Sequence, residues 1–216
     1  MTVALIVVNV LVFVFYEGIT PSQASVNELA FQPCEVNGSC PTIGQPWEIN
    51  AFTAMFMHAD IIHIGGNMLF LWIFGNNVED AMGRVRYLVF YLLAGLAATA
   101  LQTVITLETA SEAAARIPNL GASGAISGVL GAYLVMLPRA KVLTAIFLGF
   151  IFFLREIPAI YFLLIWIGFQ LWQAGFQFTQ PPTGGGVAVF AHIGGYAFGL
   201  LTVPLFRTRK PLAPLY

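Results

Sequence analysis

The sequence has 216 residues, of which 58% are hydrophobic and only 9% are charged. A water-soluble domain usually contains about 25% charged residues, so this composition excludes an ordinary soluble globular protein. The formal net charge of −1 also excludes a strongly basic nucleic-acid-binding protein and an acidic disordered chain. The composition therefore indicates an integral membrane protein.

Six apolar segments predict an all-α bundle of six transmembrane helices that forms one domain, 1–216. A spanning helix needs about 20 mainly apolar residues. The segments cover residues 2–19, 61–78, 85–107, 123–137, 159–177 and 187–206. The first lacks the basic residues that precede the apolar part of a signal peptide, so we interpret it as a helix. The fourth would extend only about 22 Å, and we expect one of its ends to lie inside the membrane.

Two connections have features of their own. The loop 20–57 is long and acidic, and it contains Cys34 and Cys40. Two cysteines without further ligands do not make a zinc site, and both free thiols and a disulfide remain open. The apolar stretch 142–154 is too short for a span, so we expect an interfacial or re-entrant segment there.

The basic residues predict the orientation of the bundle. With six spans both termini share one side, and eight of the nine Lys and Arg residues collect there. They are Arg84, Arg86, Arg139, Lys141, Arg155, Arg207, Arg209 and Lys210. This bias predicts cytoplasmic termini, with 20–57, 108–122 and 178–186 on the outer side. A seventh span at 142–154 would move the last three basic residues outside, so we reject it.

Polar side chains within apolar helices are costly and are therefore candidates for function. His63 and Asn67 are four residues apart and share a helical face. Ser123 begins the fourth segment, and His192 lies about one turn into the sixth. Hydrogen bonding between helices is the alternative role for each of them.

Glycines four residues apart follow both Ser123 and His192. The pairs are Gly124 with Gly128 and Gly195 with Gly199. Small residues at this spacing permit close contact between membrane helices. We therefore expect the fourth and sixth helices to meet and to bring Ser123 within reach of His192.

A serine beside a histidine suggests nucleophilic catalysis. The imidazole of His192 would accept the Ser123 proton during attack on a carbonyl and return a proton to the leaving amine. No acidic residue is placed to orient His192, so the pair would be a dyad. The side chains of His63 and Asn67 and the Ser123 N–H are candidate oxyanion donors.

Four motifs in order resemble the rhomboid intramembrane serine proteases. They are His58-x4-His63-x3-Asn67, Gly75-Asn76-Asn77-Val78-Glu79-Asp80-Ala81-Met82-Gly83, Gly121-Ala122-Ser123-Gly124 and Ala191-His192-Ile193-Gly194-Gly195. The resemblance implies a six-helix core with Ser123 as nucleophile and His192 as base. It also implies an oxyanion hole of His63, Asn67 and the Ser123 amide.

The resemblance assigns supporting roles as well. Gly121 and Gly124 flank the nucleophile, His58 lies near the mouth of the site, and Glu79 holds helices together at their cytoplasmic end. The implied substrates are single-span membrane proteins, cut near the outer face of the membrane and often after a small residue. The resemblance implies neither a cofactor nor a metal, and we expect a bacterial plasma membrane.

Two residues depart from the family pattern. Glu48 follows Trp47 where many relatives have arginine, and Ser127 stands where many have an aromatic residue stacked on the histidine. Glycine packing or the Ser127 hydroxyl would then hold His192. The alternative function is a catalytically inactive rhomboid-like protein that binds transmembrane clients. A small transporter or channel is a weaker alternative, because no paired ionisable residues cross the bundle.

Overall fold

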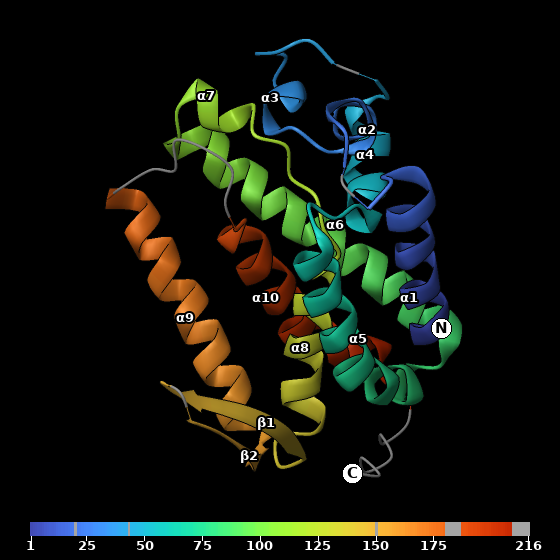
Figure 1. Cartoon of the computed structure of the whole chain (residues 1–216), viewed down its shortest axis with the longest axis vertical. Helices are drawn as coiled ribbons and strands as arrows, with labels where there is room; N and C mark the ends of the chain where they lie inside the picture. The colour runs from blue at the N-terminus through green and yellow to red at the C-terminus, as the bar shows by residue number, and fades with distance from the viewer. Residues whose placement is uncertain (20, 43, 150, 180–186, 209–216) are drawn as a thin grey trace.

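The computed structural model describes residues 1–19, 21–42, 44–149, 151–179 and 187–208. Six longer helices lie at the six predicted segments, and shorter ones gather at one end of the bundle (Figure 1). The longer helices are α1 (Thr2–Leu11) with its π-helical extension (Val12–Tyr16), α5 (Ile61–Met82), α6 (Arg84–Thr109), α8 (Ser123–Met136), α9 (Ala159–Thr179) and α10 (Val189–Phe206). The shorter ones are α2 (Gln23–Leu29), α3 (Pro33–Val36), α4 (Trp47–Thr53), a 3-10 turn (Ala54–Phe56) and α7 (Glu112–Ala115).

The described helices identify an integral membrane protein. Helices α6, α9 and α10 are each long and apolar enough to cross a membrane. Helix α5 meets the criterion together with Trp47–Phe56, from which it is bent by 80°. The α1 segment and α8 are shorter apolar helices, so the count of six spans stays a prediction. Arg209, Lys210 and most of the predicted outer loop 178–186 lie outside the described residues.

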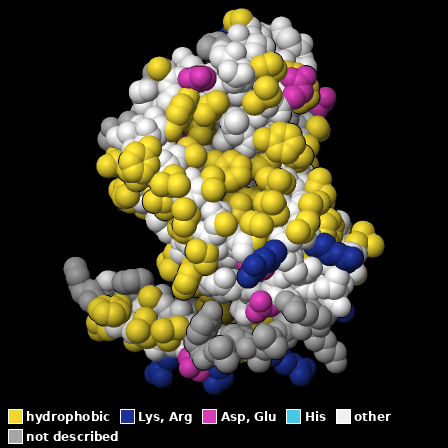
Figure 2. All heavy atoms as spheres, turned by 90° about the vertical axis from the view of Figure 1, so that its right-hand side faces the viewer, with side chains coloured by type: hydrophobic (Ala, Val, Ile, Leu, Met, Phe, Trp, Pro, Cys, Tyr) yellow, Lys and Arg dark blue, Asp and Glu magenta, His cyan; other side chains and the backbone are white. Residues whose placement is uncertain are grey.

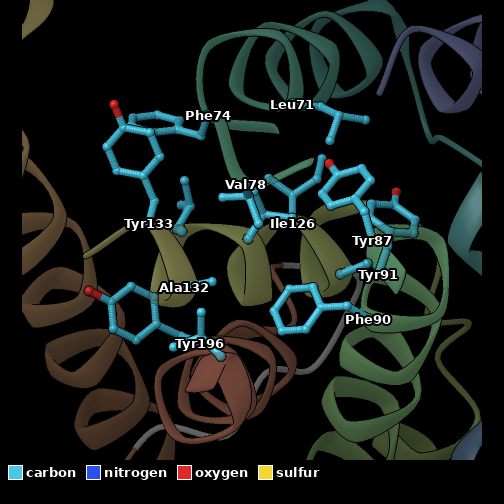
Figure 3. Packing of buried hydrophobic residues seen from close by; sticks show 14 of the residues in the cluster. Leu71, Phe74, Val78, Tyr87, Phe90, Tyr91, Ile126, Ala132, Tyr133 and Tyr196 are labelled. Carbon is cyan, nitrogen blue, oxygen red and sulfur yellow. The ribbon is translucent and has the colours of Figure 1, made fainter. Parts of the chain in front are cut away.

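Helix α8 occupies the centre of the bundle. Figure 3 shows it running between α5, α6 and α10, with side chains from all four helices in one buried cluster. Tyr133 of α8 meets Phe74 of α5 edge to face, with ring centroids 5.0 Å apart. Every residue from 124 to 133 is buried. Neighbouring helices therefore cover the middle of α8, whereas Val135 in its last turn is exposed.

The outside of the bundle is apolar along its middle. Figure 2 shows hydrophobic side chains covering the central part of one face, with Lys and Arg side chains near its lower end. Helix α9 is especially exposed, and Ile165 and Tyr161 are 72% and 61% accessible. In a membrane protein these side chains contact lipid rather than water.

The segment between α8 and α9 corrects the all-α prediction. Strands β1 (Lys141–Leu148) and β2 (Ile151–Pro158) form an antiparallel hairpin at the lower end of the bundle (Figure 1). The hairpin pairs its own backbone groups, with Leu148 opposite Ile151 beside the turn. A short apolar run has no period that separates a strand from a buried helix, so the sequence could not show this.

The opposite end is held by cross-links between loops. A disulfide joins Cys34 to Cys40, which answers the question that the sequence left open. Phe31 and Asn119 exchange two backbone hydrogen bonds, of 3.1 and 2.7 Å. The Gly121 N–H donates to the Ala54 carbonyl at 2.8 Å. These contacts position the chain immediately before α8.

Candidate active site

Helices α8 and α10 approach each other through glycines, as predicted. A Cβ atom placed on Gly195 would collide with the carbonyl oxygen of Gly124. One placed on Gly199 would collide with the carbonyl oxygen of Gly128. The two backbones are therefore in direct contact, and side chains larger than hydrogen do not fit between them.

This contact brings Ser123 and His192 together. Ser123 is the first residue of α8, and His192 lies in the first turn of α10. The Ser123 Oγ atom and the His192 Nε2 atom are 2.8 Å apart, which is hydrogen-bond distance. The hydroxyl donates when Nε2 carries no proton, and this is the arrangement that a general base requires.

The other side of the His192 ring contacts α9, which the sequence analysis missed. Its Nδ1 atom lies 2.9 Å from Gln170 Oε1, and its ring centroid lies 5.7 Å from that of Trp166. The Ser127 hydroxyl does not hold the ring, because it donates to the Ser123 carbonyl at 2.6 Å. The apolar segment 159–177 contains Gln170, Gln173 and Gln177, and the rule that selected Asn67 does not distinguish among these three amides.

His63 and Ser123 both lie beside Gly121, and the ring proton of His63 has a defined position. The Ala59 N–H donates to His63 Nδ1 at 3.3 Å, so the ring proton is on Nε2. Gly121 has a φ of +125°, and a Cβ atom there would lie 2.9 Å from His63 Nε2 and 3.7 Å from Ser123 Oγ. The bare glycine thus lets an N–H donor approach the reacting hydroxyl.

Asn67 supplies a second donor on the same face of α5. Its side chain is 8% exposed, and its Nδ2 atom has no hydrogen-bond partner within the described part of the chain. A buried amide without a partner is costly in a folded protein. This N–H group is therefore available to a bound oxyanion.

His58 lies in the turn before α5 and links it to the end of the α1 segment. The backbone N–H of His58 donates to both carboxyl oxygens of Glu17, at 3.0 and 3.1 Å. The His58 ring meets the His63 ring edge to face, with centroids 5.1 Å apart. Burial lowers the pKa of His58 to about 3. The sequence analysis did not identify Glu17 as the partner of this turn.

A protein-family model matches most of the chain. The model of the Rhomboid domain matches residues 44–209, which contain the four motifs. This chain belongs to the rhomboid family. Rhomboid protease GluP of Bacillus subtilis is 35% identical over 159 residues, which cover 72% of this chain and 25% of that protein.

Two mitochondrial rhomboid proteins are similar as well. Rhomboid protein 1 of Saccharomyces cerevisiae is 32% identical over 100 residues, covering 46% of this chain and 28% of that protein. The human presenilin-associated rhomboid-like protein is 27% identical over 171 residues, covering 74% of this chain and 40% of its own length. The rhomboid match thus spans less than half of the length of each of these relatives.

The two remaining predicted residues of the rhomboid motifs lie at helix contacts. Glu79 accepts the Thr2 N–H at 2.6 Å and so links α5 to α1. A Cβ atom on Gly124 would lie 2.6 Å from the Cβ atom of Ala98, which places α6 directly behind the nucleophile. In the described residues, no three His, Cys, Asp or Glu side chains group as metal ligands.

A cavity lies beside Ser123, and a second cavity adjoins it. One of about 40 Å³ lies beside Ser123, with Met55, Ala98 and Gly124 in its wall. A second of about 90 Å³ lies between α6 and the ends of α9 and α10. Gln102 and Ala188 line both, so the two spaces are neighbours. Space of this size accommodates water or a small side chain.

Proposed function

We propose that this chain is an intramembrane serine endopeptidase that cleaves transmembrane segments of single-span proteins. The observation that carries the proposal is the 2.8 Å contact between Ser123 Oγ and His192 Nε2 within a rhomboid-family helix bundle. Nucleophilic catalysis needs a hydroxyl and an adjacent base in this geometry. The helices around the pair are apolar, which favours substrates that are themselves embedded in the membrane.

In the first half of the reaction, Ser123 Oγ attacks the scissile carbonyl carbon while its proton moves to His192 Nε2. The carbonyl oxygen becomes an oxyanion. When this intermediate collapses, the C–N bond breaks, and the imidazolium gives its proton to the leaving amine. The products of this step are an amine fragment and an acyl ester on Ser123.

We expect three donors to stabilise this oxyanion. They are His63 Nε2–H, Asn67 Nδ2–H and the N–H of Ser123, which has no intrahelical acceptor because Ser123 begins α8. Removing one such donor typically costs about 3 kcal/mol of transition-state stabilisation. The N-terminus of α8 adds a favourable dipole.

In the second half, water attacks the ester and gives its proton to His192, and Ser123 leaves and regains a proton from the imidazolium. The cavities that meet at Gln102 offer water a route to this ester. The 40 Å³ space beside Ser123 supports cleavage after a small residue. No cofactor takes part in either half.

We also propose six spans, one domain over 1–216, and cytoplasmic termini in a bacterial plasma membrane. Packing of α1 against α5 supports including the residues before the matched domain. The β1–β2 end carries Lys141 and Arg155, whereas Arg116 binds the Ser39 carbonyl at the opposite end. The dyad then opens toward the outer face.

The test is cleavage of a model transmembrane substrate by purified protein in liposomes. We expect Ser123→Ala to abolish cleavage and labelling by a fluorophosphonate probe. Ser39→Ala, which changes an exposed serine of the α3 loop, should retain both. Cleavage by Ser123→Ala would disprove the dyad, and a folded wild-type protein that neither cleaves nor reacts would favour a client-binding protein.

A further inference from the structure

Gln170 is a buried amide on α9, a mainly apolar helix much of whose surface is exposed. Gln170 is 5% exposed, whereas its neighbours Phe169 and Leu171 are 50% and 55% exposed. The buried positions of α9 include Leu163 and Ala174, which share the face of Gln170. Burying an amide in such surroundings is costly unless it is hydrogen-bonded.

The hydrogen bond of Gln170 determines which nitrogen of His192 carries a proton. Gln170 Oε1 lies 2.9 Å from Nδ1, and an amide oxygen can only accept a hydrogen bond. The neutral imidazole therefore has its proton on Nδ1. This leaves a lone pair on Nε2, which faces the Ser123 hydroxyl at 2.8 Å.

Trp166 restrains the same ring from a second direction. It precedes Gln170 by four residues and so lies on the same face of α9. Its ring centroid lies 5.7 Å from that of His192, at an interplanar angle of 39°. The hydrogen bond and the ring contact together restrict rotation of the imidazole.

We propose that Gln170 is a positioning residue that selects the base-competent tautomer of His192. The role is that of a triad's third member, performed by a neutral amide from a different helix. Gln170 acts through the imidazole and does not touch the reacting hydroxyl. The proposal rests on the proposed function, because a base-competent tautomer matters to a hydrolase.

The kinetic test compares substitutions of Gln170. Gln170→Met has similar length but no acceptor, and we expect it to lower kcat about 10- to 100-fold with little change in KM, since a positioned base contributes about 10²–10⁴-fold. Gln170→Glu keeps an acceptor, so we expect it to recover much of this loss. Its charge should also move the acidic limb of the pH–rate profile to higher pH. Gln173→Met, on the same helix, is the matched control and should leave kcat unchanged.

A second measurement reads the tautomer without using activity. The chain has three histidines, so ¹⁵N NMR of histidine-labelled protein gives few signals, and His192→Ala assigns those of His192. We expect the wild-type proton on Nδ1, and a shift toward the Nε2–H form in Gln170→Met. This readout remains valid even if the protein proves to have no protease activity.

The outcomes separate the two proposals. A wild-type His192 with its proton on Nε2 would overturn the positioning role, whatever the activity. So would an active wild type whose kcat and pH profile are matched by Gln170→Met. An Nδ1-protonated wild type that does not cleave would support the positioning of His192 by Gln170 and disprove the protease.

Discussion

Helix α10 makes two different kinds of contact with its neighbours. Against α8, glycine meets backbone, because Gly195 and Gly199 lie on the carbonyl oxygens of α8. Against α9, side chains meet, because Trp166 packs on His192 and on Tyr196, at 5.7 and 6.0 Å. Backbone contact determines how far the nucleophile lies from the base, whereas side-chain contact determines how the base is oriented.

The glycines of α9 and α10 also differ in their contacts. In α9, a Cβ atom on Gly168 or Gly175 would meet nothing within 4 Å. In α10, a Cβ atom on Gly199 would collide with the backbone of α8. A glycine in a membrane helix therefore does not by itself indicate close packing. The position of the partner helix decides whether the glycine lies at a contact.

The largest expected effect comes from filling the α8–α10 contact. We expect Gly199→Ala to destabilise the fold by about 3 kcal/mol, because its methyl group would have to displace the α8 backbone. The same change at Gly168 should alter the free energy of unfolding by less than about 0.5 kcal/mol. Unfolding in mixed micelles by a denaturing detergent measures both. Equal effects at the two sites would remove the distinction between the two contacts.

Gly121 tests an intermediate case, in which backbone meets a side chain. We expect Gly121→Ala to lower kcat/KM about 10²-fold, because the new methyl group would displace the His63 imidazole from the oxyanion position. Gly38 also has a positive φ, of +71°, but has open space around it. Gly38→Ala is therefore the control for backbone strain alone, and it should keep full activity. A similar loss in both variants would contradict the displacement of His63.

The buried His58 offers a side-chain contact that depends on pH. Its pKa of about 3 lies below the ordinary value of 6.5, so the unfolded chain takes up a proton first as the pH falls. The contribution of neutral His58 to the free energy of unfolding is fully present above about pH 6.5 and is lost progressively as the pH falls toward about 3. The expected slope is at most about 1.4 kcal/mol per pH unit.

The variant His58→Phe isolates this contribution. The difference between wild type and His58→Phe removes the contributions of the titratable groups that both proteins share. Unfolding measured from pH 7 to pH 5 should show a smaller acid destabilisation in the variant. An unchanged slope would mean that His58 is protonated in the folded protein.

The smallest expected effect concerns the α9 ring contact. We expect Trp166→Phe to lower kcat by about 2- to 5-fold, since an aromatic pair contributes about 0.5–1.5 kcal/mol and phenylalanine retains part of it. Trp172→Phe, at a 65% exposed position of the same helix, should have no effect on kcat. Single-turnover kinetics in liposomes would resolve the difference. A larger loss than that of Gln170→Met would make the ring contact, not the hydrogen bond, the main restraint on His192.

Much of the candidate site could be predicted from local sequence. Ser123 and His192 stand in glycine-rich motifs, and the spacing of His63 and Asn67 places both on one helical face. Gln170 could not be found in this way. Its helix contains three glutamines, and only the placement of α9 against α10 shows which of them meets His192.

Two other features of the fold could not be predicted from the local sequence pattern. The hairpin of β1 and β2 and the predicted interfacial segment share the same apolar residues, and pairing across the turn selects the strands. The bond between Cys34 and Cys40 requires the loop to bring the two sulfur atoms together.

By itself, the sequence determined that this protein lies in a membrane, where its main helices are and which residue types are available for chemistry. Those properties follow from transfer free energies and helical periodicity, which act on neighbouring residues. The tertiary structure alone decided how the imidazole is oriented and which donors remain unpaired around Ser123. Such properties arise where helices distant in sequence meet, and the geometry of those contacts is set by packing rather than by any single segment.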